Sequence, residues 1–245
     1  MADYRLRNSA ATQGRTAVQV DEGLRSYMLK VYNYMGLGVA MTAILTLYVA
    51  SNPALMATIA LGPMKWVLFA GVLGLGWFAP RLIMGGNTMV AHAAYWGYAA
   101  MWGLLISPMI ARYMGIDGGK LIVQALAITS LTFGSASLFG YVTKRDMTGL
   151  GGFFMMASIG IIIAMLLNVF VFQSGLFSMI TSIITVLLFS GVTAYETQMI
   201  KNMYSQHDGN QIAQGKAIFG AFLLYGSFIT MFIHILNILG FMSSD

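Results

Sequence analysis

The sequence predicts an all-α polytopic membrane protein with seven transmembrane helices. Of its 245 residues, 58% are hydrophobic and only 9% are charged, whereas a soluble domain carries about 25% charged residues. A water-soluble globule of this composition would expose large apolar patches, and a lipid solvent removes that problem. The third observation is a series of seven apolar segments. Each has roughly the ~20 residues that a helix needs to cross the ~30 Å hydrocarbon core.

The seven segments are separated by breaks rich in glycine, polar residues or charge, which are typical of loops. The expected spans are residues 31–50, 65–83, 88–113, 120–141, 152–172, 176–200 and 217–241. The break between the fifth and sixth segments is very short, which predicts an antiparallel hairpin. Pro108 lies inside the third span, where it is expected to kink or end the helix. Residues 1–29 are expected to form a polar cytoplasmic tail, and residues 30–245 the transmembrane domain.

The positions of the cations predict the orientation. With the N-terminus in the cytoplasm, ten of the 13 Lys and Arg residues fall on the cytoplasmic side and three, Lys65, Arg112 and Lys120, on the other. Cytoplasmic loops carry such an excess of positive charge, so we expect a cytoplasmic N-terminus and an external C-terminus. This distribution of cations accounts for the net charge of +5 without a nucleic-acid partner. The partner that we expect is membrane lipid. The alternative is six transmembrane helices, with the remaining span re-entrant or buried.

Glu196 is the acidic residue that the pattern singles out. Of the eight Asp and Glu residues, it alone lies within an apolar span. An ionisable group at membrane depth is costly and therefore indicates a functional site. The alternative is that Glu196, only five residues before Lys201, reaches the interface or pairs with a cytoplasmic cation.

Two polar stripes accompany Glu196 on the last two spans, because helical spacing places their members on one face of each helix. One stripe holds Ser227, Thr230, His234 and Asn237, and the other holds Ser182, Thr185, Thr193 and Glu196. If the stripes face a shared, partly wet interior, then Thr193, Thr230, His234 and Asn237 are pore-lining candidates. The alternative is ordinary helix packing through interhelical hydrogen bonds.

Several kinds of chemistry find no support in the sequence. There is no cysteine, which excludes a thiolate nucleophile and a Cys-ligated metal. His92 and His234 have no sequence neighbours that would complete a metal site. The serine beside Gly134 lacks the Gly-x-Ser-x-Gly pattern of a nucleophile elbow. We therefore expect no catalytic residue, no metal and no cofactor, and we expect that the protein is not an enzyme.

Four segments resemble the Bax inhibitor family in its bacterial form. They are LRSYMLKVYNYMGLGVAMTA (24–43), GYVTKRDMTGLG (140–151), AYETQMIKNMY (194–204) and LYGSFITMFIHILNILG (224–240). The second is the most specific match. The segments occur in the family's order and extend the resemblance over about residues 24–241.

The resemblance implies a seven-helix fold with the last helix central, in the bacterial inner membrane. It also implies a pH-sensitive calcium leak gated by two aspartates. Glu196 stands in the place of the first aspartate and Ser227 in the place of the second, so the acidic pair is broken here. Arg81 corresponds to the family's basic latch partner. A shared-proton mechanism, which needs two neighbouring carboxylates, cannot operate unchanged in this chain.

Two functions follow from this reading. The first is pH-modulated passage of calcium or other cations, with Glu196 as the titratable group. The second is a non-conducting regulator that binds a membrane protein partner, such as a membrane protease or a stress-response component. Calcium prefers several oxygen ligands, and this interior offers one carboxylate and a few hydroxyls. That composition favours transient passage over tight binding and keeps the second function open.

Overall fold

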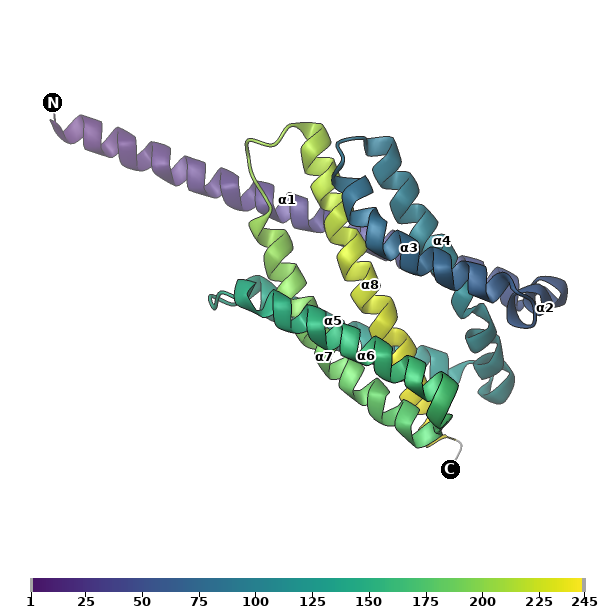
Figure 1. Cartoon of the computed structure of the whole chain (residues 1–245). Helices are drawn as coiled ribbons and strands as arrows, with labels where there is room; N and C mark the ends of the chain where they lie inside the picture. The colour runs from purple at the N-terminus through teal and green to yellow at the C-terminus, as the bar shows by residue number, and fades with distance from the viewer. Residues whose placement is uncertain (1, 244–245) are drawn as a thin grey trace.

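The computed structural model describes the backbone of residues 2–243 and the side chains of residues 22–243. This part of the chain is helical, without a β-strand (Figure 1). The helices are α1 (Ala2–Ala50), α2 (Pro53–Ala60), α3 (Met64–Met84), α4 (Thr88–Asp117), α5 (Lys120–Val142), α6 (Gly151–Leu167), α7 (Gly175–Asn202) and α8 (Asn210–Met242). A 3₁₀ turn, η1 (Thr148–Leu150), precedes α6, and a π turn, η2 (Asn168–Phe172), follows it.

Seven segments of the described chain are long and apolar enough to cross a membrane, which confirms the predicted count. They are Glu22–Ala50, Met64–Met84, Thr88–Asp117, Lys120–Val142, Thr148–Phe172, Gly175–Asn202 and Asn210–Met242. Helix α2 has eight residues and is too short to be one of them. Pro108 does not end its span, because α4 continues through it to Asp117.

Helix α1 passes through the predicted boundary between tail and transmembrane domain without a break. Among the residues whose side chains are described, the first membrane-spanning segment covers Glu22–Ala50. Tyr27 and Met28, which precede the expected start at residue 31, already pack into the core. The tail's arginines Arg5, Arg7 and Arg15 lie outside the described side chains. The division at residue 29 stays a prediction.

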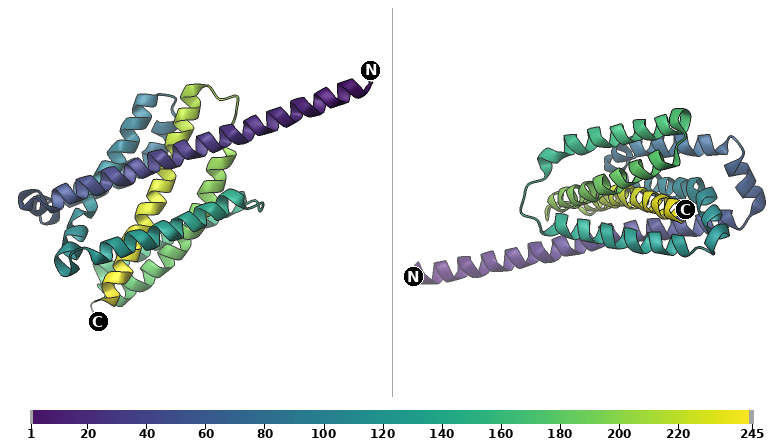
Figure 2. Two further views of the ribbon diagram at one scale, coloured as in Figure 1. Left: turned by 180° about the vertical axis from the view of Figure 1, so that it is seen from behind. Right: turned by 90° about the horizontal axis from the view of Figure 1, so that it is seen from below.

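Helix α8 is the centre of the bundle, as predicted. It contacts α1, α3, α4, α5 and α7, and it runs between them in both views of Figure 2. In its most apolar stretch 67% of the residues are buried, against none in the segment that contains α6. Tyr225, Leu224, Met231 and Leu236 are fully enclosed. A residue on α8 can therefore meet side chains from five other helices.

Helix α6 lies at the edge of the bundle. Its described residues contact α7 and the adjoining turns, and none of them is buried. The predicted hairpin with α7 is present. It is closed by Asn168, which donates to the Ser174 carbonyl and accepts from the Ser174 backbone N–H at 3.2 and 3.0 Å. Most of α6 consequently faces lipid.

Candidate functional site in the transmembrane core

Glu196 and Ser227 meet at the interface of α7 with the central helix. The Ser227 hydroxyl donates to Oε2 of Glu196 at 2.7 Å. Ser227 is only 2% exposed, and Glu196 is partly buried. The two positions that the resemblance pairs are therefore direct neighbours. The position expected to carry a second carboxylate carries a hydrogen-bond donor, so the contact is attractive when Glu196 is ionised.

Within residues 22–243, Glu196 forms no ion pair with a cation. The ion pair found there joins Lys216, in α8, to Asp208, in the α7–α8 loop, at 2.7 Å. Lys201 does not reach back to Glu196. It donates instead to the Tyr141 carbonyl at 2.8 Å and lies over the Tyr141 ring. The alternative in which Glu196 pairs with this cation does not occur in this conformation.

Arg81 is exposed near the end of α3 and forms no ion pair with Glu196. The physical reason is the position of α8. In the described part of the chain α3 and α7 both contact α8 but not each other. The latch between Arg81 and Glu196 stays a prediction for another conformation.

The polar stripes of the last two spans do face one another. The Ser182 hydroxyl contacts Nδ1 of His234 at 2.9 Å and accepts from Nδ2 of Asn237 at 2.8 Å. Asn237 also donates to Ser178 at 2.8 Å. Two of the four pore-lining candidates thus join α8 to α7. These contacts have the form of interhelical packing, and whether ions pass along them stays a prediction.

The other two candidates are satisfied within their own helices. Thr193 donates to the carbonyl of Phe189, and Thr230 to that of Gly226, both at 2.8 Å. Such i−4 bonds leave the hydroxyl oxygen as an acceptor. Thr193 is fully buried, whereas Thr230 is partly exposed.

A chain of three hydroxyls was missed by the sequence analysis. Ser137 on α5 contacts Thr197 on α7 at 2.9 Å and Tyr32 on α1 at 2.5 Å. Thr197 directly follows Glu196, which is the only signal that could have drawn attention to it. The chain leads from the outer surface of the bundle to the helix that carries the carboxylate.

Two of the motifs that carry the resemblance pack against each other. Gln198 on α7 accepts from the Met147 backbone N–H and donates to the Arg145 carbonyl, both at 2.8 Å. It thereby fixes the loop between α5 and α6. In the same loop Asp146 accepts from the backbone of Thr148. Hydrogen bonds from Thr148 hold the pKa of the Asp146 carboxyl below its ordinary value.

The described residues contain no group of three His, Asp or Glu side chains arranged to hold a metal ion. His92 on α4 has a local partner, since its Nε2 contacts Nε2 of Gln214 at 3.0 Å. Its ring also lies 5.6 Å from that of Tyr34. These contacts fit a structural histidine that ties α4 to α1 and α8.

Comparison with known proteins assigns the family. The model of the family described as inhibitor of apoptosis-promoting Bax1 matches residues 24–244. An uncharacterised protein of Rickettsia prowazekii is 37% identical over 249 residues, covering 98% of each chain. A protein of Deinococcus radiodurans is 37% identical over 236 residues, covering 95% of this chain and 96% of its own. The inner membrane protein YbhL of Escherichia coli K12 is 34% identical over 230 residues, covering 91% and 94%. With its seven membrane spans, the chain is therefore an integral membrane protein that belongs to the Bax inhibitor family.

Proposed function

We propose that this protein is a leak channel for calcium or other cations, and that protonation of Glu196 modulates its opening. The observation that carries the proposal is the Glu196–Ser227 contact. The Glu196 carboxylate lies within a membrane span and has no cation partner in the described residues. It accepts one hydrogen bond from Ser227 on the central helix. Ionisable groups at membrane depth are costly and mark ion pathways and proton relays.

The contact suggests how a proton would act. When Glu196 is ionised, Ser227 donates to a charged acceptor, and such bonds are roughly twice as strong as neutral ones. Protonation removes the charge and weakens the link between α7 and α8. We expect this loosening to favour the open state. Because one group titrates, the response should follow a single proton, unlike that of an acidic pair.

The same geometry limits how tightly an ion could be held. Calcium takes six to eight oxygen ligands at about 2.3–2.6 Å. Near Glu196 the chain offers one carboxylate and the hydroxyls of Ser227 and Thr193. This set suits brief passage of a cation rather than a resident ion, so the proposed flux is weakly selective.

The proposed location is the bacterial inner membrane, with the N-terminus in the cytoplasm and the C-terminus outside. The support is the name of the related Escherichia coli protein, an inner membrane protein, together with the ten-to-three distribution of cations.

The test is calcium flux into liposomes that contain the purified full-length protein and a trapped calcium dye, measured from pH 5 to pH 8. We expect flux to rise as pH falls through the titration of Glu196. Glu196→Gln should give flux that no longer depends on pH. Glu22→Gln is the matched control, because Glu22 is an exposed carboxylate on α1, which does not carry Glu196. It should behave like the wild type. A steep pH response that survives Glu196→Gln would show that another group is the sensor, and His234 would be tested next.

A second function has one observation in its favour. Helix α6 leaves its whole outer face uncovered in the described structure, which suits a non-conducting regulator that binds another membrane protein. Ser227→Asp separates the two functions, since it restores the second carboxylate beside the first. If neither the wild type nor this variant conducts where a relative with both acids does, the regulator replaces the channel.

A further inference from the structure

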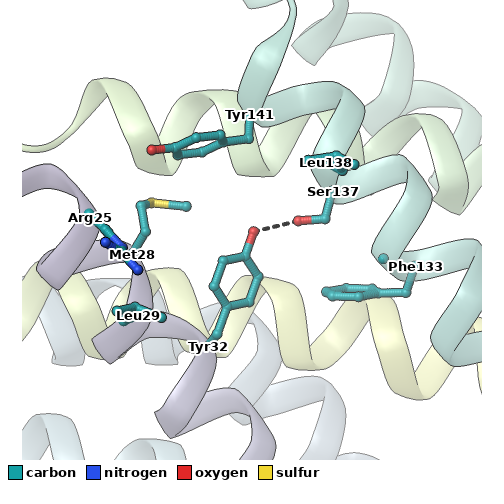
Figure 3. A pocket seen from close by; sticks show the side chains of 9 residues that line it. Arg25, Met28, Leu29, Tyr32, Phe133, Ser137, Leu138 and Tyr141 are labelled. Atoms are coloured by element: carbon teal, nitrogen blue, oxygen red, sulfur yellow. Dashed lines mark hydrogen bonds between the residues drawn. The ribbon is translucent and has the colours of Figure 1, made fainter. Parts of the chain in front are cut away.

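A crevice opens between α1 and α5 on the outer surface of the bundle (Figure 3). Its volume is about 590 Å³, and its walls include Met28 and Leu29 from α1 and Phe133 and Leu138 from α5. In the described residues the backbones of these two helices do not approach each other closely, although both contact α8, and the Tyr32–Ser137 hydrogen bond bridges the gap between them. The crevice is therefore a lateral opening toward lipid with the central helix behind it.

The crevice is charged at one end and apolar along its walls. Arg25 is exposed at its mouth, opposite Tyr141 (Figure 3). The ammonium of Lys201 lies 5.0 Å from the centre of the Tyr141 ring, which adds a second positive charge nearby. Among the residues whose side chains are described, 22–243, no carboxylate lines the crevice. Glu22, three residues before Arg25, forms no ion pair with it in the described chain. The mouth therefore favours an anion.

The apolar wall continues deeper into the membrane. A second cavity of about 140 Å³ lies between the same helices, lined by Val39 and Ala43 of α1 and by Ile122 and Leu126 of α5. Val39 is 14 residues beyond Arg25, about 21 Å along the helix. One leaflet contributes about 15 Å to the hydrocarbon core. An acyl chain that begins at Arg25 and runs through the hydrocarbon of one leaflet would thus point toward the second cavity and end about 6 Å short of Val39.

The hydroxyl chain supplies a hydrogen-bond donor in the crevice wall. Tyr32, Ser137 and Thr197 are linked in series at 2.5 and 2.9 Å. Three hydroxyls carry three hydrogens and share two such bonds, so one hydrogen, which can belong to any of the three, is left to donate to another acceptor. Thr197 is fully buried, where an unused donor is costly. When Thr197 donates to Ser137 and Ser137 donates to Tyr32, the half-buried Tyr32 hydroxyl is left to donate into the crevice.

We propose that the α1–α5 crevice binds one anionic glycerophospholipid from the leaflet at the Arg25 end. Its phosphate lies on the Arg25 guanidinium, whose planar fork suits phosphate oxygens. An ester carbonyl accepts from Tyr32, and one acyl chain follows Met28 and Phe133 toward the second cavity. This site is independent of ion passage, and the experiment below does not use flux.

The test is native mass spectrometry of the delipidated full-length protein in detergent, with added phosphatidylglycerol or phosphatidylcholine. We expect one retained phosphatidylglycerol, bound about ten-fold more strongly than phosphatidylcholine because of the cationic mouth. Arg25→Gln should weaken phosphatidylglycerol binding about ten-fold, the effect of one charge-assisted contact. Lys30→Gln is the matched control. It removes an equal charge from the same helix, at an exposed position that does not line the crevice, and should leave binding unchanged.

A second variant fills the crevice without disturbing the fold. Gly134 lines it, and a Cβ built there meets no other described atom within 4 Å. Gly134→Leu should therefore fold and lose the lipid. Gly160→Leu, on the lipid-facing α6, is equally uncrowded and should keep it. The proposal is overturned if Gly134→Leu retains the lipid, if the two head groups bind equally, or if inorganic phosphate alone displaces the lipid.

Discussion

Replacing Ser227 by alanine tests the link between α7 and the central helix. The variant removes the hydroxyl that donates to Glu196 at 2.7 Å. Hydrogen bonds to charged groups contribute about 1.5–3 kcal/mol to stability, while interhelical bonds in membranes average about 0.6 and reach about 1.7 kcal/mol. The bond is short and Ser227 is almost fully buried. We therefore expect a loss of about 1.5–2 kcal/mol, a ten- to thirty-fold change in the unfolding equilibrium.

The measurement is a double-mutant cycle on unfolding in mixed micelles at a pH at which Glu196 is ionised. The cycle compares wild type, Ser227→Ala, Glu196→Gln and the double variant. A coupling energy of about 1 kcal/mol or more is expected, because glutamine is a neutral and weaker acceptor. The coupling should shrink at low pH, where protonated Glu196 resembles glutamine. A coupling below about 0.3 kcal/mol at every pH would refute the idea that this contact holds α7 to α8.

Three further predictions concern the rest of the bundle. Gln198→Ala removes both hydrogen bonds that fix the α5–α6 loop and should speed tryptic cleavage in that loop severalfold, measured on vesicles that expose it. Gly140→Ala should destabilise the protein by about 1–3 kcal/mol, because the added Cβ would overlap a backbone carbonyl of α7. At Gly134 an added Cβ meets no described atom within 4 Å, so Gly134→Ala should be neutral or stabilising. Thermal unfolding of the two variants measures the difference. Reporter fusions after Asp245 and near Asp208 should report opposite sides of the membrane, and the same side for both would contradict the seven-span topology.

The number of spans could be read from the sequence because only the length and apolar character of each segment decide it. The ends of the spans could not. Helix α8 begins at Asn210, seven residues before the expected start. Its polar first turns are held by tertiary contacts. Gln211 donates to the Gly86 carbonyl, Gln214 contacts His92, and Lys216 donates to the Met203 carbonyl at 2.9 Å. A hydropathy pattern carries no information about such partners.

The candidate site divides in the same way. Spacing placed Glu196 and Ser227 on polar faces of their helices, but only the resemblance paired them across helices. The contact of Tyr32 with Ser137 joins positions 105 residues apart. Serine and threonine are frequent in membrane helices as packing residues, so neither their identity nor their spacing indicates which hydroxyls will meet. The register between the helices is set by their packing around α8, and this packing is seen only in the folded structure.

The position of α8 also constrains any latch between Arg81 and Glu196. Helices α3 and α7 contact α8 without contacting each other in the described structure, so the two side chains can pair only if α3, α7 or α8 moves. Movement of α8 would strain the Ser227 hydrogen bond to Glu196. In a latched state, Arg81 would then replace Ser227 as the partner of the Glu196 carboxylate, and Glu196 would still have one partner. In a relative with aspartate in place of Ser227, a cation would offset repulsion between two acids. Here the serine already stabilises the single charge, and the need for Arg81 is correspondingly smaller.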